Sequence, residues 1–386
     1  MPTSSQLHWI EAELDILKAQ AQHRQLKSAV LEPGGYVRLN GRRLLNLSSN
    51  NYLGLAEDLN VRDLVCDRDF AAGATASRLI VGNHPDYTDM ESEVAAHKRA
   101  PAGLTFGSGY LANIGIIPAL VGRGDAVYSD RLNHASIVDG IRISGAKHNR
   151  YRHRDLEHLE SMLSDGQFRR RLIVSDSLFS MDGDLAPLER LVEMKDRYNA
   201  MLMVDEAHSG GIYGDQGAGL TQALGLSDDV DVQMGTFSKA YGCYGAYVCG
   251  SQALIEYLIN RARSVIYTTG LPPMLVAVIR RAVHKVATEE WRRRRLCENA
   301  TFFRAGLEAQ GFNLGASETH IISMIVGANE STLEISDRLL SEGIAAVAIR
   351  PPTVPPNTAR LRFSVTAAHR REDLERAVAV IASAAC

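Results

Sequence analysis

Short apolar runs alternate with helix-length segments through the middle of this chain, and this alternation limits the folds that are open to it. Such a pattern is typical of an α/β fold in which a mostly parallel central sheet has helices on both faces. The clearest runs are Ala126–Ser129, Leu172–Ser175, Met201–Val204, Val230–Met234 and Ala246–Cys249. Functional residues are expected just after these runs, because ligands of such sheets bind beyond the carboxyl ends of the strands.

The N-terminal part of the chain has a different pattern. Apolar residues recur there at helical spacing and predict an amphipathic helix over about residues 6–27. The dipeptide Asn40-Gly41 is favoured in tight turns and predicts a hairpin between Tyr36–Leu39 and Leu44–Leu47. A small module therefore precedes the main domain.

The C-terminal part follows a long helical region over about residues 274–310. Helices are expected near 331–342 and 370–383, and strands near 320–326 and 360–366. This mixture indicates a smaller α+β domain. The expected organisation is an N-terminal helix and hairpin module (1–47), a large domain (48–280) and a small C-terminal domain (281–386).

Composition and charge argue against several classes of protein. The 386 residues carry a formal net charge of −3, and no long basic stretch favours a nucleic-acid partner. No apolar run approaches the roughly 20 residues that cross a bilayer, so no membrane association is expected. The five cysteines show neither disulfide nor metal-ligand spacing, which indicates the reducing cytoplasm and no metal site. The basic run Arg292–Arg295 is expected to be a solvated helix face, with a site for an anionic carrier as the alternative.

Lys239 lies in a loop of small and hydroxyl-bearing residues between two of the expected strands. A free lysine amine has a pKa of about 10.4, so at neutral pH it is protonated and not nucleophilic. An amine that is bonded as an imine to an aldehyde is not limited in this way. Thr236 and Ser238 supply hydroxyl donors for a phosphate, and the glycines of the loop allow the backbone to pass close to a bulky ligand. The loop suits pyridoxal 5'-phosphate; the alternative is an exposed lysine beside a glycine-rich turn.

Other candidates also follow expected strand ends. Asp205 ends one strand, His208 lies just beyond it, and His134 follows another strand. A buried carboxylate can keep the nitrogen of a pyridine ring protonated, and an imidazole can stack on that ring or donate to its phenolate oxygen. Ser180, in a turn-rich loop, offers a further donor. A purely structural role is the alternative for either histidine, but one edge of the sheet would gather all of these groups.

The segment Phe106–Asn113 opens an expected helix with glycines at its start. Free N–H groups and aligned peptide dipoles at a helix N-terminus favour an anion, so a phosphate is the natural ligand. In the C-terminal part, Arg350 and Arg362 are candidates for binding a carboxylate, because an inward-facing arginine is costly unless it meets one.

Six motifs together resemble one enzyme family. They are, in order, Ser48–Gly54, Asn133–Ser136, Ser180–Asp184, Val204–His208, Thr236–Lys239 and Thr358–Arg362. This combination resembles the α-oxoamine synthases, pyridoxal-phosphate enzymes of the aspartate-aminotransferase fold (fold type I). Members of this family condense an amino acid with an acyl thioester and release carbon dioxide. The resemblance covers the chain from about residue 30 to 380.

The resemblance implies a role for each candidate at the cofactor. Lys239 would hold the cofactor covalently and then act as the base, with Asp205 at the pyridine nitrogen and His134 stacked on the ring. Ser180 and His208 would approach the phenolate oxygen. Residues implied at the phosphate are Ser108, Gly109, Tyr110, Thr236 and Ser238, and Thr268 and Thr269 would reach the cofactor of a partner subunit in a homodimer with shared active sites.

The resemblance also implies the substrates. Arg362 would hold the carboxylate of the amino acid, Arg24 and Arg350 are candidates for the acyl end, and Asn50 and Thr353 are further substrate-binding candidates. The segments Ala348–Pro355 and Thr366–His369 are most similar to members that condense L-alanine with pimeloyl-CoA, or a pimeloyl carrier protein, in biotin biosynthesis. The alternatives are a related enzyme that uses glycine or serine with another acyl group, a non-catalytic subunit of the same fold, and a plain nucleotide-binding α/β protein.

Overall fold

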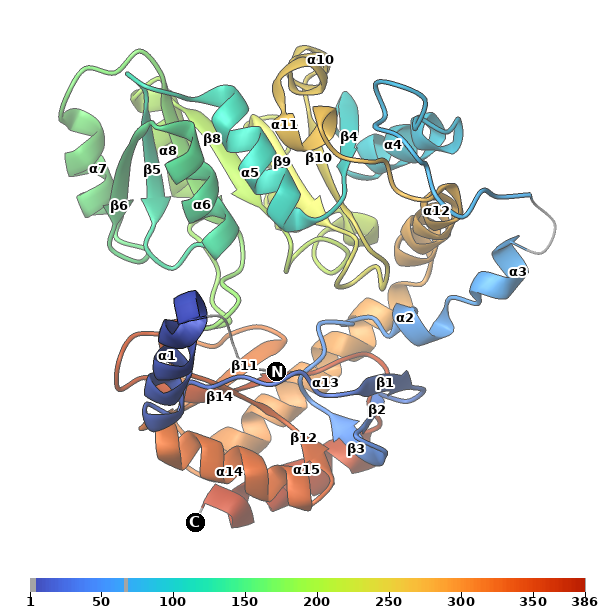
Figure 1. Cartoon of the computed structure of the whole chain (residues 1–386), viewed down its shortest axis with the longest axis vertical. Helices are drawn as coiled ribbons and strands as arrows, with labels where there is room; N and C mark the ends of the chain where they lie inside the picture. Colours follow the sequence, from blue (N-terminus) through green and yellow to red (C-terminus); the bar gives the residue numbers. More distant parts are fainter. Residues whose placement is uncertain (1–4, 66–68, 386) are drawn as a thin grey trace. The chain divides into compact units, whose positions relative to one another are not determined.

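The computed structural model describes residues 5–65 and 69–385, which fall into two compact units (Figure 1). The large unit comprises Asn50–Ser180 and Asp184–Leu296. The small unit comprises Met1–Ser49, Met181–Gly183 and Cys297–Cys386. The two units are described separately below.

This division differs from the expected segments 1–47, 48–280 and 281–386. The N-terminal module belongs to the same unit as the C-terminal part, because strand β3 (Arg42–Asn46) pairs in parallel with β12 (Ile344–Ala345). The second boundary lies inside the helix α13 (Glu290–Ala309) rather than near residue 280. The sequence has no glycine or proline at this boundary, because α13 continues through the boundary without a break.

A seven-stranded sheet forms the centre of the large unit, with the order β4-β10-β9-β8-β7-β5-β6. The ladders from β9 to β6 are parallel, whereas β10 is antiparallel to both of its neighbours. The predicted, mostly parallel sheet is therefore confirmed. The strands are β4 (Ala102–Phe106), β5 (Ala126–Asp130), β6 (Lys147–Tyr151), β7 (Arg171–Asp176), β8 (Met201–Asp205), β9 (Val232–Thr236) and β10 (Ala246–Gly250).

Helices cover both faces of this sheet, as predicted. Alternate strand residues enter two separate apolar cores, so that Val127 packs with one group of helices and the adjacent Tyr128 with another. The first core includes α5 (Gly109–Leu120), α6 (Ala135–Ser144), α10 (Gln252–Arg261) and α11 (Arg263–Ile266), and the second includes α7 (Leu156–Ser164) and α8 (Leu188–Arg197). The remaining α-helices of this unit are α2 (Leu55–Asp58), α3 (Val61–Val65), α4 (Asp86–His97), α9 (Leu220–Ala223) and α12 (Pro273–Thr288).

The small unit has two sheets, β1-β2-β3-β12 and β11-β14-β13. The predicted hairpin is present: Leu39 pairs with Arg42, and Asn40 and Gly41 both have the positive φ values (47° and 84°) that the favoured two-residue turn requires. The predicted N-terminal helix is shorter than expected. The other elements of this unit are α1 (His8–Ala19), β1 (Ala29–Glu32), β2 (Tyr36–Leu39), β11 (Ile321–Gly327), α14 (Asn329–Ser341), β13 (Val347–Ile349), β14 (Ala359–Ser364) and α15 (Arg371–Ala385).

The basic run Arg292–Arg295 is only partly a solvated face. Arg292 is buried, and its guanidinium donates to Glu289 (2.6 Å), to Asp58 (2.6 Å) and to the carbonyl of Leu53 (2.9 Å). The expectation was wrong for this residue, because a helix through the run turns one of the arginines inward.

Across residues 5–65 and 69–385, no helix has the length and apolar character needed to span a bilayer, and no cluster of His, Cys, Asp and Glu could hold a metal ion.

Candidate active site

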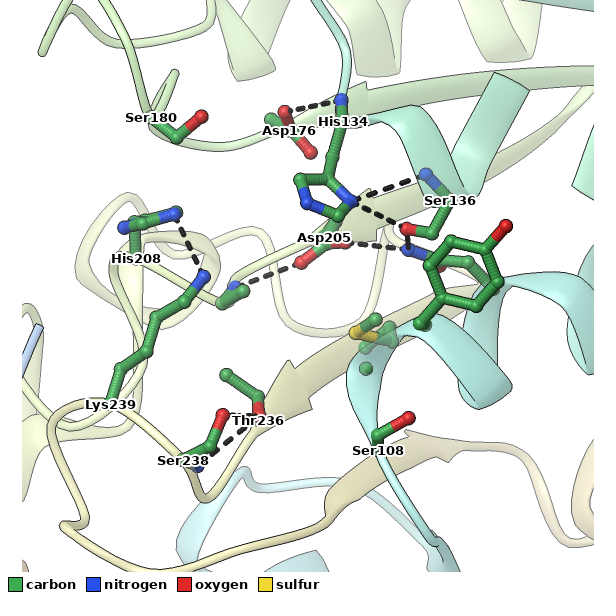
Figure 2. A pocket seen from close by; sticks show the side chains of 15 residues that line it. Ser108, His134, Ser136, Asp176, Ser180, Asp205, His208, Thr236, Ser238 and Lys239 are labelled. Atoms are coloured by element: carbon green, nitrogen blue, oxygen red, sulfur yellow. Dashed lines mark hydrogen bonds between the residues drawn. The ribbon is translucent and has the colours of Figure 1, made fainter. Parts of the chain in front are cut away.

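A cavity of about 220 Å³ opens at the carboxyl edge of the large sheet (Figure 2). Residues at or just beyond the ends of β5, β7, β8 and β9 line it, together with the first turns of α5 and α6. This is the edge at which parallel sheets bind their ligands. The lining residues are Ser108, Gly109, Tyr110, Asn113, His134, Ser136, Asp176, Ser180, Asp205, Ala207, His208, Met234, Thr236, Ser238 and Lys239.

One wall of the cavity is suited to an anion. Ser108 caps α5, and its Oγ accepts from the backbone N–H of Leu111 (3.2 Å). The first N–H groups of a helix have no acceptor within the helix, so those of α5 can bind an anion. Thr236 Oγ1 and Ser238 Oγ lie 2.7 Å apart at the end of β9. Hydroxyls next to a helix N-terminus form a phosphate site without any cationic side chain.

Two buried carboxylates, Asp176 and Asp205, occupy paired positions on β7 and β8. Asp205 accepts from Asn113 Nδ2 (2.9 Å) and from the backbone N–H of Ala207 (2.9 Å), and Asp176 accepts from the backbone N–H of His134 (3.0 Å). Burial and the charge of Asp205 raise the pKa of Asp176 well above its usual range. The pair therefore favours either a shared proton or a cation beside it.

His134 stands at the N-cap of α6. Its Nδ1 lies 2.7 Å from Ser136 Oγ and accepts from the backbone N–H of Ser136 (3.2 Å), which fixes the orientation of the ring. Burial lowers the pKa of His134 by more than the charge of Asp205 raises it. The ring is therefore uncharged at neutral pH and presents a flat face to the cavity.

Lys239 faces a chain of hydrogen-bonding groups. Its Nζ lies 2.7 Å from His208 Nε2, and His208 Nδ1 lies 2.7 Å from the hydroxyl of Tyr52 (Figure 2 shows the first contact). The Tyr52 hydroxyl donates to Asn50 Oδ1 (3.0 Å), so it accepts from His208 Nδ1–H and leaves Nε2 to accept from Lys239. The arrangement gives the lysine nitrogen a neighbour that can take its proton.

The donor set fits pyridoxal phosphate. That molecule presents a phosphate, a ring nitrogen that binds a proton, and an aldehyde carbon that reacts with an amine. The helix terminus and hydroxyls suit the phosphate, the carboxylate pair suits a protonated nitrogen, and Lys239 supplies the amine. Asn113 lines the cavity, and its buried Oδ1 has no hydrogen-bond donor among the described residues, a deficit that a donor group of a bound ligand would remove.

Comparison with known proteins also indicates a pyridoxal-phosphate enzyme. The family model described as aminotransferase class I and II matches residues 42–381. The chain belongs to this family. Within it the chain is an α-oxoamine synthase, as the motifs predicted, and it is a pyridoxal-phosphate-dependent transferase.

Similar proteins and solved structures match this chain over most of its length. A protein of Geobacillus kaustophilus named "Putative 8-amino-7-oxononanoate synthase" is 53% identical over 369 residues, which are 95% of this chain and 94% of the relative. A protein of the same name from Halalkalibacterium halodurans is 50% identical over 374 residues, 96% of this chain and 95% of the relative. Serine palmitoyltransferase from S. paucimobilis has a TM-score of 0.92 at 30% identity, covering 100% of this chain and 98% of that one. The 8-amino-7-oxononanoate synthase of Francisella tularensis has a TM-score of 0.78 at 28% identity, covering 88% and 97%.

The structure gathers most of the candidates for the cofactor in one cavity. All of those named from the sequence line it except Thr268 and Thr269, which border a separate hollow with Arg78 and Tyr87. Substrate candidates lie elsewhere: Asn50 accepts from Tyr52 in the large unit, and Arg362 is buried on β14 of the small unit, where it donates to Ser364 Oγ (2.7 Å). Arg24, Arg350 and Thr353 line a second cavity, within the small unit.

Sequence reasoning missed several residues of the cavity. Asp176 ends β7 just as Asp205 ends β8, so the rule that selected Asp205 also selects Asp176. Asn113 and Ser136 lie in the first turns of α5 and α6, where residues next to an anion site are expected. Tyr52 does not line the cavity and could be found only through its contact with His208.

The glycines around Lys239 have a different function from the one expected. They were expected to make room for a ligand, but a side chain at Gly235 would meet the ring of Tyr247 (2.4 Å) and one at Gly242 would meet the backbone nitrogen of Ala56 (2.4 Å). The expectation that a ligand is the close neighbour was wrong. These two glycines instead allow other segments of the same chain to pack closely against the Lys239 loop.

Gly242→Ala is expected to destabilise the large unit more than a matched substitution does. Gly242 (φ +65°) combines a left-handed backbone with a backbone clash, whereas Gly225 (φ +72°) has the same conformation and nothing within 4 Å. Left-handed strain alone costs roughly 1–2 kcal/mol, and we expect about 3 kcal/mol or more for Gly242→Ala and about 1 kcal/mol for Gly225→Ala in urea denaturation. Equal losses in the two variants would contradict the role assigned to Gly242.

Proposed function

We propose that this enzyme condenses L-alanine with a pimeloyl thioester and releases 8-amino-7-oxononanoate, carbon dioxide and the free thiol, a step of biotin biosynthesis. The names of the relatives at about 50% identity support this reaction. The observation that carries the choice of acyl group is a cavity of about 1050 Å³ in the small unit, whose lining combines apolar side chains with two arginines.

The residues of the first cavity would hold the cofactor as follows. Lys239 would bind it covalently, Asp205 would hold its protonated nitrogen, and His134 would cover the ring. Bound there, pyridoxal phosphate accepts the electrons that are released at the α carbon of the amino acid. We assign the phosphate to Ser108, Gly109, Tyr110, Thr236 and Ser238, and the phenolate oxygen to Ser180 and His208.

Lys239 and His208 would handle the proton. With the cofactor and alanine bound, Lys239 Nζ would take the α proton, and His208 Nε2, which lies 2.7 Å from Nζ, would accept a proton from it in turn. The α carbon would then bond to the thioester carbonyl carbon as the carbon–sulfur bond breaks, and the departing thiolate would take a proton from solvent. The carboxylate departs as carbon dioxide, and Nζ returns a proton to the α carbon. Arg362, buried on β14, would bind the alanine carboxylate before this step, with Asn50 near the amino acid.

The cavity of the small unit suits a dicarboxylic acyl chain. It encloses about 1050 Å³, and Arg24, Arg350 and Thr353 line it together with the apolar side chains of Leu31, Val37, Leu39, Leu333 and Leu340. Burial and the neighbouring charge of Arg24 lower the pKa of Arg350. Two cations so placed attract an anion, and a pimeloyl group offers methylenes for the leucines and a terminal carboxylate for the arginines.

Serine with a long acyl chain is the second candidate. It is favoured by the TM-score of 0.92 to serine palmitoyltransferase, against 0.78 to the Francisella tularensis 8-amino-7-oxononanoate synthase. The two arginines oppose it, because an acyl chain without a carboxylate would add no counter-charge to that of Asp337, which also lines the cavity. A non-catalytic role is opposed by the presence of Lys239, Asp205 and His134 around one cavity.

We also infer a homodimer with shared active sites. The large unit exposes Leu79, Ile80, Val81 and Tyr267, with exposed fractions of 50%, 74%, 77% and 72%. Tyr267 directly precedes Thr268 and Thr269, the residues assigned to the cofactor of the partner subunit. Large apolar side chains on a surface are typical of an interface.

The substrate choice is tested by thiol release with L-alanine, glycine and L-serine, each combined with pimeloyl, acetyl, succinyl and palmitoyl thioesters. The highest kcat/KM is expected for L-alanine with pimeloyl, and Lys239→Ala is expected to release no thiol above background, since it removes both the covalent anchor and the base. A preference for L-serine with palmitoyl would establish the second candidate instead. Substantial turnover by the lysine variant would refute the assignment of Lys239.

Arg350→Ala is expected to raise KM for the pimeloyl thioester about tenfold, because it removes one charge-assisted contact with the terminal carboxylate. The matched substrate is the heptanoyl thioester, which has the same chain length without that carboxylate, and its KM is expected to change less than twofold. Steady-state kinetics with each thioester at saturating alanine measure both effects. Equal increases in KM for the two thioesters would show that Arg350 does not bind the terminal carboxylate.

Sedimentation equilibrium is expected to give twice the chain mass of 42.2 kDa. Ile80→Asp, which places a charge among the exposed apolar residues, is expected to shift the protein towards monomer and to lower cofactor content at the same time. Glu256, on α10, is exposed, so Glu256→Asp is the control and should stay dimeric. A wild-type protein with the mass of one chain would refute the inferred dimer.

A further inference from the structure

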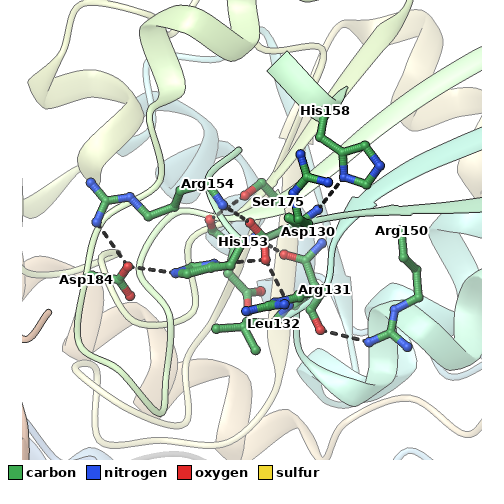
Figure 3. Close-up of polar contacts among 12 residues, drawn as sticks. Asp130, Arg131, Leu132, Arg150, His153, Arg154, His158, Ser175 and Asp184 are labelled. Atoms are coloured by element: carbon green, nitrogen blue, oxygen red, sulfur yellow. Dashed lines mark hydrogen bonds and ion pairs between the residues drawn. The ribbon is translucent and has the colours of Figure 1, made fainter. Parts of the chain in front are cut away.

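His153 lies between two buried carboxylates outside the cofactor cavity (Figure 3). Its Nδ1 is 3.0 Å from Asp130 Oδ1, and its Nε2 is 2.8 Å from Asp184 Oδ2. Asp130 and Asp184 are 2% and 1% exposed, so neither carboxylate can rely on water to stabilise its charge.

The geometry requires a doubly protonated ring. An ionised carboxylate only accepts hydrogen bonds, so a ring nitrogen facing each one must carry a proton. Both carboxylates accept from further donors: Asp130 accepts from the backbone N–H groups of Leu132 (2.8 Å) and Arg154 (2.8 Å), and Asp184 accepts from Arg154 Nη1 (3.1 Å). Burial opposes the charge of His153, but the two aspartates outweigh it and raise its pKa to about 9.

The two aspartates anchor two different loops of the cavity. Asp130 ends β5 and begins the turn that leads to His134; its carbonyl accepts from the backbone N–H of Asn133 (3.2 Å). Asp184 closes the loop that carries Ser180, and its carbonyl accepts from the backbone N–H of Phe179 (3.0 Å).

The ring of Phe179 also meets the ring of His153 edge-on, with 4.5 Å between the centroids. His153 therefore contacts the Ser180 loop through Asp184 and through Phe179. The loop is closed at its base by the bridge between Leu178 and Leu185.

Few other groups near His153 change charge between neutral and alkaline pH. Arg154 is a permanent cation. Tyr151 lies at the end of β6, and burial together with the charge of Asp130 raises its pKa far above the ordinary value. Burial and the charges of Asp205 and Asp130 raise the pKa of Asp176, but Asp176 is present in both His153→Gln and wild type, so its titration contributes to both proteins. A change near pH 9 that depends on this cluster therefore belongs to His153.

We propose that His153 is a positioning residue: its cationic ring joins Asp130 to Asp184 and so holds the His134 turn and the Ser180 loop in the arrangement that binds pyridoxal phosphate. The inference concerns the cofactor and does not depend on which amino acid or acyl group the enzyme uses. Its failure would leave the proposed reaction untouched.

The test compares His153→Gln with His148→Gln. His148 lies on β6, five residues before His153, is half-buried and has its Nε2 2.8 Å from a hydroxyl, Ser129 Oγ, so it controls for loss of a neighbouring imidazole that is not paired with a carboxylate. Apoprotein is titrated with pyridoxal phosphate, and the Kd and the visible circular dichroism of the bound cofactor are recorded. At about pH 7.5 we expect His153→Gln to raise Kd about tenfold and to weaken the dichroism, with less than a twofold change in the control.

The pH dependence separates positioning by charge from a general loss of packing. The ring is charged below its raised pKa and loses its proton as the pH rises through about 9, so the ratio of Kd between His153→Gln and wild type should fall towards one by about pH 10. A ratio that stays constant with pH, or a folded variant with wild-type Kd and dichroism, would overturn the proposal.

Asp184→Asn decides the matter if His153→Gln does not fold. This substitution keeps the shape of the side chain and leaves His153 paired with Asp130, but it removes half of the stabilising charge. The rise of Kd with pH should then begin at a lower pH than in wild type. An unchanged pH profile of Kd in folded Asp184→Asn would refute the proposal.

Discussion

The carboxyl edge of the parallel sheet places Asp176 and Asp205 side by side, and the rest of the cavity depends on this pair. Their positions follow from the register of β7 and β8, in which the two residues are direct partners. Like charges in a buried site cannot both remain without a counter-charge. The surroundings supply backbone and amide donors, and the charge of Lys239 lowers the pKa of Asp176 but does not outweigh burial and Asp205, so a further cation brought by a ligand stabilises the pair. A ring nitrogen that holds its proton meets this need.

A buried ion pair fixes the exit of the same strand. Glu206 follows Asp205 and pairs with Lys98; neither side chain is exposed, and Glu206 also accepts from the backbone N–H of Thr221 (2.9 Å). Gly219 passes so close that a side chain there would lie 2.5 Å from Glu206 Oε1 and 2.6 Å from Lys98 Nζ. A pair of this kind gives little net stability, because desolvation offsets the attraction, but it holds the backbone at Asp205 in one conformation.

The sequence predicted the parts of the structure that depend on local pattern. Buried strands stand out as apolar runs, and the ends of these strands located Lys239, Asp205, His208 and His134 before any contact was known. Exposed strands were harder: β6 (Lys147–Tyr151) consists mainly of polar residues because it lies at the edge of the sheet, and no apolar run marks it. Periodicity alone cannot detect such a strand.

Long-range pairing accounts for most of the remaining differences. The N-terminal module joins the small unit through the short ladder of β3 and β12, which are separated by nearly the whole chain, and neither strand carries a signal for its partner. The contact between Tyr52 and His208 could not be predicted for the same reason, because the two residues are far apart in the sequence. The atoms that lie against Gly235 and Gly242 also belong to other segments of the chain.

Two sets of buried, paired charges lie behind the residues that a ligand in the cavity would touch. Lys98 with Glu206 fixes the exit of β8, and His153 joins the ends of two loops; none of the three lines the cavity. A ligand with a phosphate and a ring needs donors held in place before it arrives, because ordering them at binding would reduce affinity. Loops alone are too mobile to provide this, since they make few apolar contacts. Buried ion pairs at the bases of the loops therefore do what apolar packing does elsewhere in the sheet: they fix the loop ends while leaving the cavity open.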